Sequence, residues 1–184
     1  SVIKTFEGIY VLNLTENIFT DCNNPDSTYW VTDETKNLKG LYEKLYSTRN
    51  IYGAVYAKLK GEIVDTKDRI GKNTSEKYPK TILVKEVLNI EKKNFKNSCL
   101  KYDFWALGNE PNWSLEISKT ENRIEFIDYS QNQFYHFFYE EPRIEPGKII
   151  YITHNNIQQY IIDVIIKEEK CSDTMSDIEY DYSV

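Results

Sequence analysis

The sequence predicts a mainly β protein with one helix, built as an OB-like five-stranded barrel followed by an antiparallel all-β sheet or half-barrel. Most segments alternate apolar and polar residues, which is the pattern of strands. Only one segment, residues 35–49, has helical spacing. The chain also has 15 Tyr but only 7 Gly and 5 Pro, a composition that favours strands over long flexible loops.

Residues 1–100 are expected to form the barrel. Strands are predicted at 6–14, 19–22, 28–32, 52–64 and 79–91. The helix falls between the third and fourth strands, with Asp33 or Thr35 as its cap. Its apolar stripe consists of Leu38, Leu41, Tyr42, Leu45 and Tyr46. Residues 65–78 are polar and are expected to form a long exposed hairpin loop. An OB-type barrel with a helix inserted mid-sequence accounts for this order.

Residues 101–184 are expected to be all β. Strands are predicted at 102–107, 113–117, 123–129, 133–139, 148–154 and 158–167, separated by segments rich in turn-forming residues. Sequential short strands with tight turns indicate an antiparallel meander. The chain therefore divides into two predicted domains, 1–100 and 101–184.

The distribution of charge excludes one class of partner. The formal net charge is −6. Residues 1–100 carry 16 Lys/Arg and 13 Asp/Glu (16 − 13 = +3), whereas residues 101–184 carry 7 and 16 (7 − 16 = −9). No basic face is concentrated enough to bind phosphate backbones, so no nucleic acid is expected as a partner. No segment approaches the roughly 20 apolar residues of a membrane-spanning helix.

The sequence contains no residue pattern typical of catalysis or of metal binding. His136 and His154 are the only histidines and fall on different predicted strands, and the three cysteines include no CxxC pair. There is no GxSxG elbow and no Gly-rich phosphate loop. We therefore expect no catalytic residues, no metal and no cofactor. An enzyme would need Glu110, His136 or His154 to converge with other polar groups in a deep pocket.

The stretch GNEPNW at 108–113 concentrates unusual residues before a strand. Gly108 and Pro111 suit a tight corner, where Asn109 and Glu110 can satisfy backbone donors and acceptors. Trp113 starts the strand and shares a face with its next two apolar residues. Two interpretations remain open, namely a fold-defining corner and a binding site formed by Asn109, Glu110 and Trp113.

Five aromatic residues and His136 occupy positions 134–139. On a strand, their side chains divide between two faces. They can therefore fill the core on both faces of a sandwich, or they can present a surface to a ligand or partner.

Six segments of the first hundred residues carry a resemblance to a known family. They are GIYV at 8–11, FTDC at 19–22, YWV at 29–31, LKGLY at 38–42, YGAVYAKLKGEI at 52–63 and the closing Cys99. In these segments the chain resembles the OB-fold domain of NlpE-type bacterial envelope lipoproteins. The family pairs the Cys after the second strand with the Cys that ends the domain, which implies a Cys22–Cys99 disulfide. The copper-associated CxxC of the founding member is absent, so no copper site is implied.

Two motifs carry a second resemblance, which covers residues 101–184. GNEPxWxLxI stands at 108–117, and CxDxMSDxxYxY stands at 171–182. With these motifs the chain resembles an uncharacterised bacterial lipoprotein or membrane-associated family. Related domains continue to a further strand with another Cys, so the resemblance implies that Cys171 lacks its partner here.

The second motif is also similar to the SGxxY element of c-type lysozyme inhibitors. Ser176, Asp177 and Tyr180 match that element, with Asp in place of the glycine. An acidic loop of this kind can approach a basic lysozyme through electrostatic steering.

The two resemblances, together with the lack of a catalytic residue pattern, imply a non-enzymatic lipoprotein of the bacterial cell envelope, anchored in the outer membrane and facing the periplasm or the surface. Its expected partner is an envelope protein, another envelope component or a small apolar ligand. The membrane is a partner only through a lipid anchor absent from this chain, which is expected on a lipobox cysteine upstream of Ser1. The alternative is a protein similar to lysozyme inhibitors.

Overall fold

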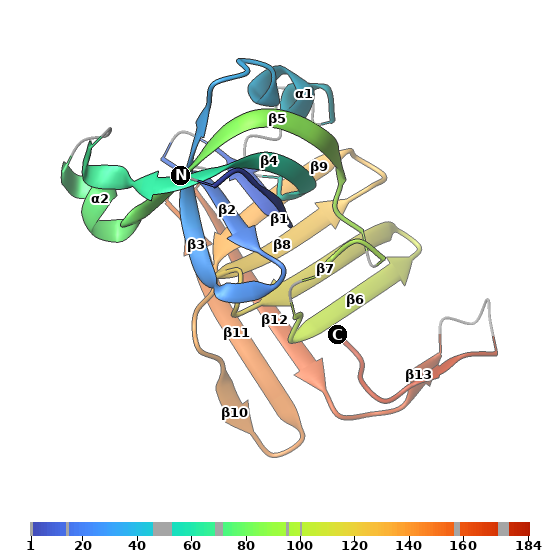
Figure 1. Ribbon diagram of the computed structural model, residues 1–184. Helices are drawn as coiled ribbons and strands as arrows, with labels where there is room; N and C mark the ends of the chain where they lie inside the picture. The colour runs from blue at the N-terminus through green and yellow to red at the C-terminus, as the bar shows by residue number, and fades with distance from the viewer. Residues whose placement is uncertain are drawn as a thin grey trace. The chain divides into compact units, whose positions relative to one another are not determined.

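Strands dominate both halves of the chain, as the alternation of the sequence predicted. The computed structural model describes residues 2–13, 15–45, 53–68, 72–94, 96–99, 101–156, 159–172 and 177–184. The chain separates into two units, residues 1–101 and 102–184, each with its own sheets (Figure 1). None of the described helices is long and apolar enough to cross a lipid bilayer.

Five strands of the first unit close into a barrel in the order β1-β2-β3-β5-β4. They are β1 (Lys4–Leu12), β2 (Asn17–Asp21), β3 (Asn24–Asp33), β4 (Val55–Asp65) and β5 (Lys80–Lys92). All neighbouring pairs are antiparallel except β3 and β5, which are parallel. Closure leaves no free sheet edge in the barrel. The predicted five-stranded barrel is therefore confirmed.

Buried and more exposed residues alternate over the first half of β4 but not over its second half, and not on β1. Val55 and Leu59 of β4 are fully buried, with more exposed residues between them. On β1, the four consecutive residues 8–11 are all buried, and Ile9 and Val11 form a small separate cluster with Ala54. Both faces of β1 are thus covered, which the alternation alone did not reveal.

Helix α1 (Leu38–Leu45) is shorter than the predicted helix at 35–49, of which residues 46–49 lie outside the described residues. Asp33 caps its start. One carboxylate oxygen of Asp33 accepts a hydrogen bond from the backbone N–H of Leu38 at 2.8 Å, and the other accepts one from the N–H of Thr35 at 2.9 Å. Leu38 and Tyr42 form the buried part of the apolar stripe.

A second helix corrects the prediction of a long exposed loop at 65–78. Thr66–Asp68 form a 3-10 turn, η1, and Lys72–Lys77 form α2, so the described part of the barrel unit has two α-helices and not one. The sequence KNTSEK has no apolar stripe, and periodicity therefore could not reveal this helix. A buried hydrogen bond of 2.8 Å between the hydroxyls of Thr66 and Thr81 fixes η1 to the start of β5.

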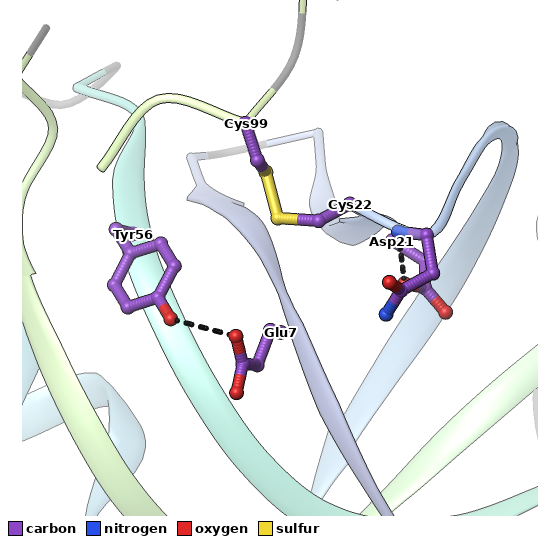
Figure 2. The surroundings of a disulfide bond; sticks show 6 residues. Glu7, Asp21, Cys22, Tyr56 and Cys99 are labelled. Atoms are coloured by element: carbon purple, nitrogen blue, oxygen red, sulfur yellow. Dashed lines mark hydrogen bonds between the residues drawn. A yellow bond between two sulfur atoms is a disulfide. The ribbon is translucent and has the colours of Figure 1, made fainter. Parts of the chain in front are cut away.

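A disulfide joins Cys22, in the turn between β2 and β3, to Cys99 near the end of the unit (Figure 2). The two Cα atoms are 5.3 Å apart, and 77 positions separate the residues in the sequence. Figure 2 also shows Tyr56, whose hydroxyl donates a hydrogen bond of 3.3 Å to the carboxylate of Glu7. The disulfide that the family resemblance implied is confirmed, and Cys171 is a free thiol.

The described residues of the second unit form three antiparallel sheets. The first contains β6 (Phe104–Asn109), β7 (Asn112–Ser118), β8 (Arg123–Asp128) and β9 (Gln133–Phe138), and the second contains β10 (Arg143–Glu145), β11 (Lys148–Asn155) and β12 (Tyr160–Lys167). A two-stranded sheet pairs β13 (Cys171–Ser172) with β14 (Glu179–Tyr180). The strands β10, β13 and β14 were not predicted, because two or three residues are too few to show a period.

The two larger sheets of this unit share one hydrophobic core. The fully buried members are Leu115, Ile117, Ile124 and Phe137 from the four-stranded sheet and Tyr151, Val164 and Ile166 from the three-stranded sheet. Hydrogen bonds fasten the end of β11 to β9. The Thr153 hydroxyl donates to the carbonyl of Phe138 at 3.0 Å, and the Asn155 side-chain amide donates to the carbonyl of His136 at 2.7 Å.

Candidate binding groove in the second unit

A cavity of about 590 Å³ opens beside the hydrophobic core of the second unit. Its first wall is the inner face of the four-stranded sheet. This wall consists of Trp113, Leu115, Phe126, Tyr135 and Phe137. The side chains share one face because directly opposed residues of antiparallel strands point the same way, and Leu115, Phe126 and Tyr135 are opposed in turn across β7, β8 and β9. The volume lies in the range of small-molecule pockets.

Strand β12 forms the second wall. All six residues from Tyr160 to Ile165 line the cavity, together with Val184. Consecutive residues of a strand point to alternate faces, so a cavity bordered by six in a row lies along the edge of the strand. Since β12 is the outermost strand of its sheet, the cavity is a groove along an open strand edge. We call it the β12 groove.

A chain of aromatic rings crosses the groove. The ring centroids of Trp113 and Phe126 are 5.9 Å apart, as are those of Phe126 and Tyr135. Tyr135 then meets Tyr160 of β12 edge to face at 5.0 Å. Such aromatic pairs add about 0.5–1.5 kcal/mol each beyond the burial of their surface. Tyr135 therefore connects the sheet face to β12.

Two carboxylates, and no basic side chain, occur among the described residues that line the groove. Asp128 lies on the inner face of the sheet because it is opposed to Trp113. The Ser130 hydroxyl and the backbone N–H of Gln131 donate to one carboxylate oxygen at 2.5 and 3.0 Å, and these hydrogen bonds hold the pKa of Asp128 below its usual value. Asp163 is exposed on β12. The groove is thus apolar with negative charge on its borders.

The turn at 109–112 forms a corner outside the groove. Asn109 and Glu110 are exposed there, and of the three residues predicted around this turn only Trp113 lines the groove. The Glu110–Pro111 peptide bond is cis. Gly108 is directly opposed to Trp113, and a Cβ at position 108 would lie 2.1 Å from the indole nitrogen. The missing side chain of Gly108 therefore makes room for the ring of Trp113.

The second motif lies away from the groove. Asp177 and Tyr180 are exposed, beside and within the β13–β14 hairpin, whereas Ser176 lies outside the described residues. The thiol of Cys171 donates a hydrogen bond to the backbone carbonyl of Tyr182 at 3.2 Å. None of these residues lines the groove.

The aromatic run at 134–139 divides between the two faces of β9. Tyr135 and Phe137 point to the core and the groove. His136 and Phe138 point to the opposite face, where Phe138 is half exposed. Tyr135 and Phe137 therefore contribute both to the hydrophobic core and to the wall of the groove.

The polar residues considered for catalysis differ in burial, since one is buried and two are exposed. His136 is buried, and its Nδ1 lies 3.7 Å from a carboxylate oxygen of Glu125, which in turn lies 3.9 Å from a guanidinium nitrogen of Arg123. His154 and Glu110 are exposed. Within the described ranges, no group of three or more His, Cys, Asp or Glu side chains is placed to hold a metal ion.

Sequence reasoning missed the contribution of β12, because residues 158–167 were predicted only as a strand. One signal was present. Asp163 interrupts an otherwise apolar run, and a charge within an apolar strand is typical of sheet edges.

Comparison with known proteins matches the chain to no family model, to no curated protein and to no solved structure.

Proposed function

We propose that this protein is a non-enzymatic binding protein whose β12 groove takes up an apolar part of a ligand or partner. The observation that carries the proposal is the aromatic-lined cavity of about 590 Å³ along an open strand edge. Concave, mainly apolar sites with a few polar groups are typical of binding sites. Ile161 at the border of the groove is 74% exposed, and an exposed apolar surface of this kind commonly marks a site of interaction.

The proposed cellular address is the bacterial envelope, in a lipoprotein related to the NlpE type. The sequence resemblance supports this address, and so does a closed barrel fastened by the Cys22–Cys99 disulfide. Such bonds form and persist mainly in oxidising compartments. The coding sequence upstream of Ser1 tests the address. A signal sequence that ends in a lipobox cysteine is expected, and a cytosolic start would contradict it.

Binding in the groove is tested with the neutral fluorophore N-phenyl-1-naphthylamine. Saturable binding to the intact chain is expected. Replacing Tyr135 by Ala removes the ring that connects the sheet to β12. The loss of this ring should weaken binding of the aromatic fluorophore by up to about tenfold, since a ring–ring contact is worth about 0.5–1.5 kcal/mol. Tyr129→Ala is the matched control, because Tyr129 is a half-exposed Tyr of the same unit that does not line the groove. Absence of saturable binding, or equal weakening by both substitutions, would refute the proposal.

Lysozyme inhibition is a second candidate, favoured by the exposure of Asp177 and Tyr180 beside the β13–β14 hairpin. The formal charge of −9 in residues 101–184 would attract a basic enzyme. A turbidity assay of lysozyme with the purified chain in molar excess tests this function. Inhibition that Tyr180→Ala abolishes would support it, and unchanged lysis would remove it.

A further inference from the structure

We infer that the β12 groove binds an extended peptide, which adds as an antiparallel strand to the free edge of β12. The inference rests on the proposed function and specifies the class of partner. It follows from the direction of the backbone groups of β12, from a strand contact that already exists on the same edge, and from the charge beside it.

Hydrogen bonds at the end of β12 show which residues point to the free edge. The backbone N–H of Glu168 donates to the carbonyl of Gly147 at 3.1 Å, so these two residues form a hydrogen-bonded pair. In an antiparallel ladder such pairs alternate with pairs that make no hydrogen bonds. With the observed register, Ile166, Val164 and Ile162 therefore bond to β11. The intervening residues of β12 direct both of their backbone groups away from β11.

The C-terminal segment confirms this direction. Lys167 and Ser183 form an antiparallel bridge with both hydrogen bonds, at 2.9 and 3.0 Å, on the side of β12 away from β11. Three further residues with the same direction, Ile161, Asp163 and Ile165, have no backbone partner within the described ranges. The edge thus already accepts one residue of a strand and presents three more donors and three more acceptors.

The groove specifies the side chains of the added strand. Residues of a peptide opposite Val164 and Ile162 would share the inner face with them and enter the aromatic cavity. The residue opposite Asp163 would share the outer face with its carboxylate. The five-residue segment opposite Ile165–Ile161 is therefore expected to have apolar second and fourth residues and a basic central residue. This alternation is the recognition mode of strand addition at a sheet edge.

A second copy of the chain fits this edge less well. Antiparallel pairing of two β12 strands that uses Ile161, Asp163 and Ile165 of both copies places Asp163 opposite its own equivalent. Like charges directly opposed across strands are destabilising. A charge on an edge strand also protects against such self-association. The complementary partner is therefore a basic and apolar peptide.

The probe is the peptide acetyl-Thr-Val-Lys-Val-Thr-amide, added to the intact ¹⁵N-labelled chain. In the free protein the amides of Ile162 and Val164 are expected to exchange slowly with solvent, and those of Ile161, Asp163 and Ile165 rapidly. Binding of the peptide should slow exchange at these three amides. Methylating the backbone nitrogen of the central Lys removes one donor to β12 and should weaken binding by about tenfold.

Asp163→Asn should weaken binding of this peptide by about two- to fivefold, the range of an exposed ion pair. Asp163→Lys should restore binding to a peptide whose central Lys is replaced by Glu. Asp26→Asn, a change of an exposed residue on a strand of the first unit, is the matched control and should leave affinity unchanged.

Several outcomes would overturn the inference. If N-phenyl-1-naphthylamine binds but the peptide does not, the groove takes small molecules, and the proposed function stands without the inference. If neither binds, both fail. Peptide binding that ignores the N-methyl group, or a dimer of the free chain that excludes the peptide, would likewise refute strand addition by a partner.

Discussion

Removing the disulfide of the first unit is expected to cause a large loss of stability in that unit alone. The change is the double substitution Cys22→Ser and Cys99→Ser. The bond closes a loop with a sequence separation of 77. In the chain-entropy model, a cross-link over such a loop lowers the entropy of the unfolded chain enough to stabilise the folded state by about 4.5 kcal/mol at 25 °C. Domains of this size are stable by only about 5–15 kcal/mol, so the loss is a large fraction of the total.

Hydrogen exchange in urea, followed by mass spectrometry, measures this loss unit by unit. A single unfolding curve is unsuitable because a chain with two units need not unfold in one step. With an m-value near 1.5 kcal/mol/M, the unfolding midpoint reported by fragments of β1–β5 should fall by about 3 M. Fragments of β6–β9 should keep the midpoint of the unaltered chain, since the bond lies within the first unit.

Cys171→Ser is the matched control, because it removes a cysteine that forms no disulfide. It should leave the free energy of unfolding of both units unchanged within about 0.5 kcal/mol. A loss below about 1 kcal/mol in the double variant would refute the reasoning from loop entropy. So would an equal loss in both units.

Three further outcomes are expected. Gly108→Ala should destabilise the second unit by about 1–3 kcal/mol in urea unfolding, because the new Cβ would overlap the ring of Trp113, and a change below about 0.5 kcal/mol would contradict this close approach. Ser130→Ala should raise the pKa of Asp128 in a carboxyl ¹³C NMR titration. The pKa of Asp128 is depressed in the folded chain, so its carboxylate stabilises the fold at pH values above the unfolded pKa. This stabilisation is lost as the pH falls through the folded pKa. It should be smaller in the variant, because the two pKa values are then closer together. Alkylation before reduction should label one cysteine, Cys171, and two or three labels would contradict the disulfide.

The sequence revealed those parts of the fold in which side-chain periodicity is strong. Alternation located the long strands, and the stripe with Leu38 and Tyr42 located α1. The same reasoning could not find α2, because Lys72–Lys77 carry no apolar residue that would reveal a helical period. It also missed β10, β13 and β14, because strands of two or three residues are too short to show an alternation.

The candidate site could be predicted only in part. The position of Trp113 at the start of a strand and the alternation of the aromatic run both follow from sequence, and these residues do form the first wall of the groove. The second wall depends on β12 being an edge strand. Whether a strand is an edge or a central one depends on which strands pair with it. Apart from the charge of Asp163, nothing in the sequence of Ile161–Ile165 indicates that pairing.

The covalent loop of the first unit also determines how the chain would respond to mechanical force. In a chain pulled at Ser1 and Val184, tension would pass from Cys22 to Cys99 through the sulfur atoms. The segments β3, α1, β4, α2 and β5 lie between these residues, and none of them could be extended while the bond is intact. At about 3.5 Å per extended residue, the sequence separation of 77 corresponds to roughly 270 Å of contour length that the intact disulfide keeps from extending. Reduction of the Cys22–Cys99 bond would therefore allow force to extend the whole segment between these two residues, which the intact bond keeps from extending.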